Sequence, residues 1–411
     1  EHEHGIDIGN IDAVLMFGAP KTAESFAQRL GRGNRRSGTS VVRGLCRSFS
    51  ESGVERPLLT DVLLFVALAT AMDRGLLETV HAPLHYGVLA QQLAAMAIRY
   101  GQVGASAMAR PLAALGFPET IGDVLSEILA GMVEQDLLVR NPVGPGFVAA
   151  DAIEDLRRGA SLWSNIPGAS VATVLDAQGP VAEVPRDFVP RLEPGSQIRV
   201  AGRVRRVTRV DGNSISTTQV SGPISGHVET PGYRSQLTFG SAVLAGCARE
   251  ALRGRGLASL PISYDDATRA SLKAERARFA GAADEETMIE FVGEEIVLYT
   301  FLGGLLNRIY LDLLKMQVGA SGSSDSLAIR VKNTDIFALK NPDSSYDAVV
   351  LVIQNQVQIY ASMLSLSPHT KYLSKALLLS DVMEAIRPRE ASARLTAFLR
   401  SSFRQLEAPV H

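Results

Sequence analysis

Residues 28–35 read Gln28-Arg29-Leu30-Gly31-Arg32-Gly33-Asn34-Arg35. This stretch is the strongest indication of the fold of the N-terminal part of the chain. Arg32 and Arg35 are three residues apart, so one helical turn places both guanidinium groups on the same side. Together they can stabilise the charge that develops on a γ-phosphate during phosphoryl transfer. We therefore predict that both arginines act catalytically on a bound nucleotide. Gln28 would hold that nucleotide or couple its hydrolysis to domain closure, and Gly31 is assigned to the same site. The alternative is a solvated basic loop, because more arginines follow closely.

A second informative stretch lies upstream and reads Gly5-Ile6-Asp7-Ile8-Gly9-Asn10-Ile11-Asp12. Gly5 and Asp7 are assigned to the nucleotide site. They would couple the closure of the domains around the nucleotide to nucleic acid bound in the cleft between those domains. Residues 12–18 then form an almost wholly apolar run, as expected for a parallel strand buried on both faces. Residues 22–30 follow with helical spacing. Strand, loop and helix in this order are typical of a RecA-like α/β domain, of which residues 1–55 would be the last part.

The sequence contains no phosphate-binding loop of the form G-x-x-x-x-G-K-[ST]. The nearest imitation, at residues 18–22, lacks the first glycine, and Pro20 removes a backbone N–H that a phosphate cradle requires. The chain alone is therefore not expected to hydrolyse ATP. The matching half of the nucleotide site is expected upstream or in another molecule.

The length of 411 residues exceeds what one hydrophobic core usually supports, which indicates two to four domains. The net charge is −2, so any contact with nucleic acid must come from local basic patches. Cys46 and Cys247 lie far apart, which fits a reduced compartment with inert thiols. The apolar runs are too short to span a bilayer and no signal peptide opens the chain, so we expect a cytoplasmic protein.

Four segments follow from the pattern of elements, and the chain is predicted to be multidomain, combining α/β and α+β architecture. After the RecA-like remnant, residues 56–165 contain amphipathic helices at 57–79, 86–99 and 121–132 and a closing hairpin, as in a winged helix. Residues 166–245 hold short β-branched strands and predict a small antiparallel barrel-like module. Residues 246–411 mix strands with helices, including a Gly/Ser linker at 319–324 and a helix at 371–403 broken at Pro388.

The strand predicted at 202–210 carries several arginines. Alternation along a strand would place Arg203, Arg205 and Arg209 on one face with Val207, where they could neutralise phosphates of nucleic acid. The alternative is a solvated edge kept basic against aggregation. Trp163 likewise fits either packing at a domain junction or stacking on a base. No metal site is predicted, because His2 and His4 have no third or fourth ligand.

The motifs resemble those of a known family. The stretch at 5–12 and the arginine string resemble motifs V and VI of superfamily-two helicases of the DEAD/DEAH-like type. Within that group, residues 87–97 resemble the D-V-L-A-Q-Q-x-x-A element of large helicase-related (Lhr-type) proteins. Further matches, in the family's order, lie at 194–210, 298–307 and 401–404.

The resemblance implies a remnant of the second RecA-like domain, a winged helix, a β-barrel module and a mixed C-terminal segment. It implies an ATP-dependent helicase that uses ATP with Mg²⁺ and moves 3′ to 5′ on single-stranded DNA, unwinding duplexes or RNA–DNA hybrids. Its partners would be single-stranded DNA or an RNA–DNA hybrid, and the missing N-terminal RecA-like domains in cis or in trans.

The sequence departs from the family at three places. Asn34 stands where the family usually has glycine, and Gly87 stands where aspartate is usual. A tryptophan that often precedes a P-G-R-S-like stretch is absent, since residues 226–228 read Gly-His-Val there. The alternative function is a non-enzymatic nucleic-acid-binding module from a split or truncated helicase gene. A structural scaffold is a third possibility.

Overall fold

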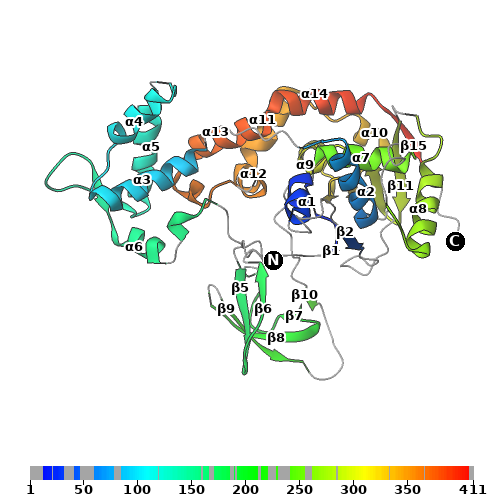
Figure 1. Cartoon of the computed structure of the whole chain (residues 1–411), viewed down its shortest axis with the longest axis horizontal. Helices are drawn as coiled ribbons and strands as arrows, with labels where there is room; N and C mark the ends of the chain where they lie inside the picture. Colours follow the sequence, from blue (N-terminus) through cyan, green and yellow to red (C-terminus); the bar gives the residue numbers. More distant parts are fainter. Residues whose placement is uncertain are drawn as a thin grey trace. The chain divides into compact units, whose positions relative to one another are not determined.

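The structure of the chain is a computed structural model, which describes residues 13–20, 22–31, 41–46, 60–77, 85–118, 120–158, 161–165, 171–185, 189, 192–211, 214–220, 228–229, 241–254, 262–283, 286–332, 334–364 and 366–406. The chain forms two compact units, each with helices and strands (Figure 1). The first unit comprises Glu1–Pro83, Thr238–Tyr360 and Val382–His411, and the second comprises Leu84–Leu237 and Ala361–Asp381. The predicted mixed α/β character is confirmed.

The described front of the chain is a strand–helix–strand element. Its parts are β1 (Ala13–Phe17), α1 (Ala23–Leu30) and β2 (Val41–Leu45), and the two strands pair in parallel. The Thr22 hydroxyl caps α1 by accepting a hydrogen bond from the Ser25 N–H at 3.1 Å. The expectation that the first strand is buried on both faces is wrong. Met16 is buried in the core, whereas Phe17, on the opposite face, is 80% exposed.

The helix α2 (Thr60–Asp73) packs against α7 (Ala242–Leu252) within the first unit, and Figure 1 shows the two side by side. The sequence of α2 is apolar around most of its circumference, so the helix must be covered on several sides. Its leucines share one core with α1, α7 and the five-stranded sheet. The predicted segment 56–165 is therefore divided between the two units.

A five-stranded sheet organises the rest of the first unit, in the order β13-β14-β12-β11-β15. Its strands are β11 (Glu286–Val292), β12 (Glu295–Tyr299), β13 (Ser321–Ser324), β14 (Ile329–Lys332) and β15 (Ser402–Gln405). The Gly/Ser stretch predicted as a linker thus contributes an edge strand instead. Gly322 approaches β14 so closely that a Cβ would lie 1.9 Å from the Arg330 carbonyl oxygen, so only glycine fits there.

Helices make up most of the remaining described part of the first unit and continue into the second. They are α8 (Asp266–Phe279), α9 (Gly304–Val318), α10 (Ile336–Lys340), α11 (Tyr346–Asn355), α12 (Val357–Met363), α13 (Lys375–Ile386) and α14 (Pro388–Leu399). The predicted break at Pro388 is confirmed. Arg387 adopts a left-handed conformation with φ of 57°, and Pro388 begins the next helix.

The second unit begins with three helices and a two-stranded antiparallel sheet. These elements are α3 (Tyr86–Tyr100), α4 (Ala105–Ala114), α5 (Ile121–Glu134), β3 (Leu138–Arg140) and β4 (Phe147–Ala149). The helix α6 (Asp151–Arg158) and the 3₁₀ turns η1 (Ser161–Trp163) and η3 (Pro368–Tyr372) complete this part. One apolar core joins α3, α5 and the hairpin to Tyr372 of η3.

The second unit also contains a six-stranded sheet in the order β10-β7-β8-β9-β5-β6. Its strands are β5 (Val171–Asp176), β6 (Gly179–Pro185), β7 (Gln197–Val200), β8 (Arg203–Asp211), β9 (Ser214–Gln219) and β10 (Val228–Glu229). The predicted antiparallel arrangement holds for three neighbouring pairs, but β5 with β9 and β10 with β7 run parallel. A small core of its own lies under this sheet.

No helix within the described part of the chain combines the length and the apolar character that crossing a membrane requires.

Candidate functional site

The helix α1 leads directly into the arginine string. Ala23 and Phe26 bury one face of the helix, and Gln28 is exposed on another. Gly31 ends the helix, and its N–H donates to the Ala27 carbonyl at 2.8 Å. The predicted site residues Gly5, Asp7, Arg32 and Arg35 lie outside the described residues. The structure thus presents Gln28 to solvent at the end of α1, where the string begins.

The strands β1 and β2 have one covered and one open face. Val14, Met16 and Val42 pack on the core of the first unit. The opposite face exposes four large apolar side chains, which are Leu15 at 53%, Phe17 at 80%, Val41 at 53% and Leu45 at 45%. Parallel strands are usually covered on both faces, so four exposed large apolar side chains on one face are unusual for such a pair.

Arg205 is not available for binding. Its side chain is buried, and its Nη1 lies 2.8 Å from Asp176 Oδ2 in an ion pair with β5. Val207, on the same face of β8, belongs to the core under the sheet. Arg203, Arg205 and Val207 do share one side of β8, as predicted, but this side faces the interior beyond Arg203, so the prediction of a phosphate-binding face there is wrong.

A β-bulge explains where Arg209 goes. The register pairs Val207 with Thr217 but Arg209 with Ser216, so one extra residue is inserted into β8. The alternation shifts by one, and Val210 rather than Arg209 packs toward the core. Arg209 therefore lies on the outer side of the sheet.

The outer side of the sheet carries three exposed arginines. Arg206 pairs with Thr218 and lies on the same side as Arg209. In β7, Arg199 pairs with Val204, two residues before Arg206, and so shares that side. We call Arg199, Arg206 and Arg209 the outer basic face. Sequence reasoning missed Arg199, although its position between the apolar Ile198 and Val200 is a signal of outward orientation.

The acidic side chain that contacts the outer basic face, Asp211, does not prevent this face from binding a ligand. Arg209 contacts Asp211 at 2.7 Å, but the two side chains are 73% and 64% exposed, so this ion pair is weak and exchangeable. Arg203 is exposed at the start of β8 and donates to Gln219 Oε1 at 3.1 Å. The pKa of Asp176 is lowered by the hydrogen bond from the Gln178 N–H and by Arg205, so this carboxylate stays ionised.

Trp163 is not part of the core. Its side chain is 58% exposed, whereas the neighbouring Leu162 is fully buried. Of the two possibilities that the sequence left open, packing at a junction does not describe the indole. It lies at the surface of the second unit, at the end of η1.

Gly87, in the D-V-L-A-Q-Q-like element, lies where α3 approaches η3. A Cβ at this position would lie 3.0 Å from both Ser367 Cβ and Thr370 Cγ2, so there is little room for a side chain. The carboxylate of Asp381 accepts the Tyr86 N–H at 3.0 and 3.2 Å instead. A carboxylate from another element thus stabilises the start of α3 in a sequence that lacks the usual aspartate.

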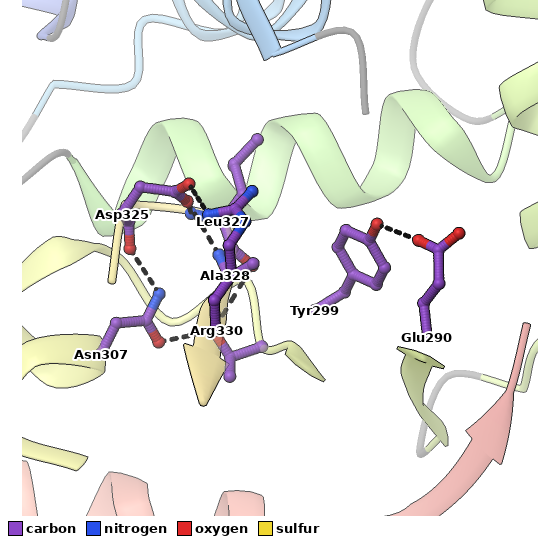
Figure 2. Close-up of polar contacts among 8 residues, drawn as sticks. Glu290, Tyr299, Asn307, Asp325, Leu327, Ala328 and Arg330 are labelled. Atoms are coloured by element: carbon purple, nitrogen blue, oxygen red, sulfur yellow. Dashed lines mark hydrogen bonds and ion pairs between the residues drawn. The ribbon is translucent and has the colours of Figure 1, made fainter. Parts of the chain in front are cut away.

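Asn307, at the end of the family match at 298–307, has a structural role. It is fully buried inside α9, accepts from the Thr300 hydroxyl at 2.5 Å and donates to the Asp325 carbonyl at 2.7 Å. Figure 2 shows how the Asp325 side chain in turn accepts from Leu327, Ala328 and Arg330. This network fixes the loop before β14 and does not form an open site.

Gly303 makes a tight turn between β12 and α9. Its φ is +86°, and a Cβ would lie 2.8 Å from Ala242 Cα at the start of α7. In the sheet beside it, the Tyr299 hydroxyl donates to Glu290 at 2.6 Å (Figure 2). Glu290 also pairs with Arg278 at 2.5 Å, so this carboxylate is held by partners within the fold.

The thiols and acidic groups suggest no further chemistry. Cys46 and Cys247 are free, and the pKa of each is raised, chiefly by desolvation, to about 11 for Cys46. Both are therefore protonated near neutral pH. Among the residues that the structure describes, no group of three or more His, Cys, Asp or Glu side chains could hold a metal ion.

No protein-family model matches the chain. Two curated proteins named ATP-dependent helicase Lhr-Core are similar to it. The one from Methanocaldococcus jannaschii is 25% identical over 232 residues, which cover 53% of this chain and 25% of that protein. The one from Methanothermobacter thermautotrophicus is 28% identical over 242 residues, which cover 54% of this chain and 26% of that protein. The chain thus spans about a quarter of the length of these relatives.

A solved structure is also similar. The Mycobacterium smegmatis helicase Lhr, determined bound to ssDNA and AMP-PNP, matches over 97% of this chain and 55% of that chain. The TM-score is 0.56 and the sequence identity is 17%, so this likeness concerns the fold. Together with the curated relatives, it confirms the resemblance predicted from the motifs: this chain resembles part of an Lhr-type helicase.

Proposed function

We propose that the chain is the C-terminal portion of an ATP-dependent helicase or translocase. It would move 3′ to 5′ on single-stranded DNA and open duplex DNA or RNA–DNA hybrids. The observation that carries the proposal is the outer basic face of the six-stranded sheet. The similarity to ATP-dependent helicases named Lhr-Core gives that face its context.

The outer basic face supports binding to the nucleic-acid backbone. Arg199, Arg206 and Arg209 are exposed on adjacent strands, and arginine is well suited to phosphate because its guanidinium donates in a planar fork. Three arginines can neutralise about three phosphates, which makes affinity depend on salt rather than on base sequence. Arg203, exposed at the start of β8, is proposed as an additional contact.

The nucleotide half of the proposal depends on the arginine string. Arg32 and Arg35 would stabilise the transferring phosphoryl group of ATP bound with Mg²⁺, and Gln28 would hold the nucleotide beside Gly31. Gly5 and Asp7 would link that site to nucleic acid. Because the chain has no phosphate-binding loop, RecA-like domains in cis or in trans would complete the site. The exposed apolar face of β1 and β2 supports this, since a further layer of an α/β domain would cover it.

The remaining parts fit accessory roles. Three helices followed by a hairpin are consistent with a winged helix, and the six-stranded sheet is consistent with the barrel-like module. Both would hold the single strand while the motor advances. The alternative function remains a non-enzymatic nucleic-acid-binding module.

Reconstitution tests the proposal. The chain is mixed with separately produced N-terminal RecA-like domains of an Lhr-type helicase, and ATP hydrolysis is measured with and without single-stranded DNA. We expect DNA-stimulated hydrolysis only in the mixture. Binding of a single-stranded oligonucleotide without hydrolysis in any mixture would favour the binding module. If the chain does not bind a single-stranded oligonucleotide even at low salt, the proposal is overturned and a structural scaffold is the function that remains.

A further inference from the structure

Trp163 is the single tryptophan of the chain, and it remains at the surface of the second unit with 58% of its area exposed. Burying a large apolar side chain normally stabilises a protein, because apolar surface is removed from water. The core beside it accepts Leu162 fully but not the indole. Packing of the second unit therefore gives no reason for a tryptophan at this position.

The backbone on both sides of Trp163 is fixed by buried side chains. Gln91 of α3 is 5% exposed, and its Nε2 donates to the Leu162 carbonyl at 2.9 Å. His369 of η3 is 2% exposed, and its Nε2 lies 3.2 Å from the Ser164 carbonyl. A carbonyl only accepts, so this nitrogen carries the proton. The carbonyl groups of the residues before and after Trp163 are thus anchored to two different elements.

The next residue extends the network. Asn165 Nδ2 donates to Gln91 Oε1 at 2.7 Å, and its Oδ1 accepts from the Ser367 hydroxyl at 2.8 Å. The Ser367 hydroxyl also accepts the His369 N–H at 3.2 Å. Breaking any of these bonds would leave a buried or partly buried polar group without its partner, which is costly. Residues 162–165 are therefore held rigidly while the indole between them projects outward.

The neighbouring elements contribute charged groups rather than further exposed apolar surface, and those of α6 are of both signs: its sequence holds three acidic residues and two arginines. The helix α6, which packs against η1, has Arg157 exposed near its end, and η3 has Lys371 exposed two residues after His369. Ile153 of α6 and Tyr372 of η3 are buried. A rigid exposed indole, with the exposed Lys371 on the element that anchors it, fits a ligand that has both flat apolar groups and negative charge, which describes an unpaired nucleic-acid strand.

We propose that Trp163 is a stacking platform for an unpaired base of single-stranded nucleic acid, preorganised by Gln91, Asn165, Ser367 and His369. The inference rests on the proposed function and adds a base-stacking contact that is separate from the phosphate contacts of the outer basic face. Because the platform is already ordered, binding loses little conformational entropy. Every base has a π-face, so the contact is expected to be tolerant of sequence.

The test uses the single tryptophan as its own reporter. The full chain is titrated with a fluorescein-labelled single-stranded oligonucleotide to follow anisotropy, and with an unlabelled one to follow indole emission. We expect quenching of the indole with the same midpoint as the anisotropy change. Trp163→Ala should weaken affinity by roughly 10- to 100-fold, the value of one stacked base, and Trp163→Phe should retain most of it.

Two variants separate stacking from a structural effect. Tyr100→Ala removes another exposed aromatic side chain of the second unit and should leave affinity unchanged. Gln91→Ala should weaken affinity and also lower the steady-state anisotropy of the indole, because the segment is released. If the oligonucleotide binds by anisotropy while indole emission and the Trp163→Ala affinity stay unchanged, stacking is refuted and the proposed function stands. If the Trp163 emission responds to an added protein partner but not to the oligonucleotide, the surface around Trp163 is a protein interface and stacking is refuted. If the wild-type chain binds no oligonucleotide, both proposals fail.

Discussion

The outer basic face makes a quantitative prediction about salt. For single strands, the logarithm of the affinity falls with the logarithm of salt concentration with a slope of about −0.7 per neutralised phosphate. Arg199, Arg206 and Arg209 should together contribute about −2 to that slope. A fourfold rise in salt, from about 50 to about 200 mM, should then weaken binding by about 20-fold through these contacts. In the Arg206→Ala variant, the same rise in salt should weaken binding through the two remaining contacts by only about 7-fold.

Fluorescence anisotropy of a labelled oligonucleotide at several salt concentrations measures these slopes directly. Each of the three single alanine variants should shallow the slope by about 0.7 and weaken binding about equally across base sequences. Arg269→Ala is the matched control, because this arginine lies in α8 of the first unit with 63% of its side chain exposed. Slopes that are identical in the wild type and in all three outer-face variants would refute the assignment of this face to phosphate binding.

Three further predictions concern the nucleotide site and the fold. In a reconstituted motor, Arg32→Ala should reduce ATP turnover by about 10³- to 10⁵-fold with little change in oligonucleotide affinity, and near-normal turnover would exclude a finger role. Gly131→Ala should destabilise the helical core by about 1–3 kcal/mol in urea unfolding, because its Cβ would lie 2.4 Å from the Tyr372 carbonyl oxygen. Gly122→Ala, in the same helix with nothing within 4 Å, is its control and should be neutral or stabilising; equal effects would contradict the steric argument. The lowered pKa of Asp176 means that its ionised form stabilises the fold at neutral pH. That stabilisation is complete above the unfolded-state pKa of about 3.9 and is lost as the pH falls through the lower folded-state value. The stability difference between wild type and Asp176→Asn should therefore be constant near neutrality and shrink below about pH 4, and a difference that does not depend on pH would be inconsistent with this account.

The sequence predicted elements whose signals are local. The apolar run at 12–18 and the helical spacing at 22–30 correspond to β1 and α1, and Pro388 marks a helix boundary because proline restricts the residue before it.

Features that depend on distant partners could not be predicted in the same way. The bulge in β8 exists only in relation to β9, so strict alternation assigned Arg209 to the wrong side. The burial of Arg205 depends on Asp176, which lies on another strand. The placement of α2 depends on α7, far along the chain, and the prediction of an amphipathic helix at 57–79 is wrong for α2, whose sequence is apolar around most of its circumference. The exposure of Trp163 depends on Leu162 filling the available space.

The core of the first unit joins the two ends of the described chain. Met16 of β1 and Leu406, which follows β15, belong to one buried cluster, and β15 pairs with β11. During synthesis on the ribosome, β1 can contact α1 and α2 early, but this core is complete only after Leu406 has emerged. The core of the second unit is also completed late, because it includes Tyr372 and Leu377. Contacts between residues so far apart in sequence are expected to slow folding and to prolong the exposure of apolar surface.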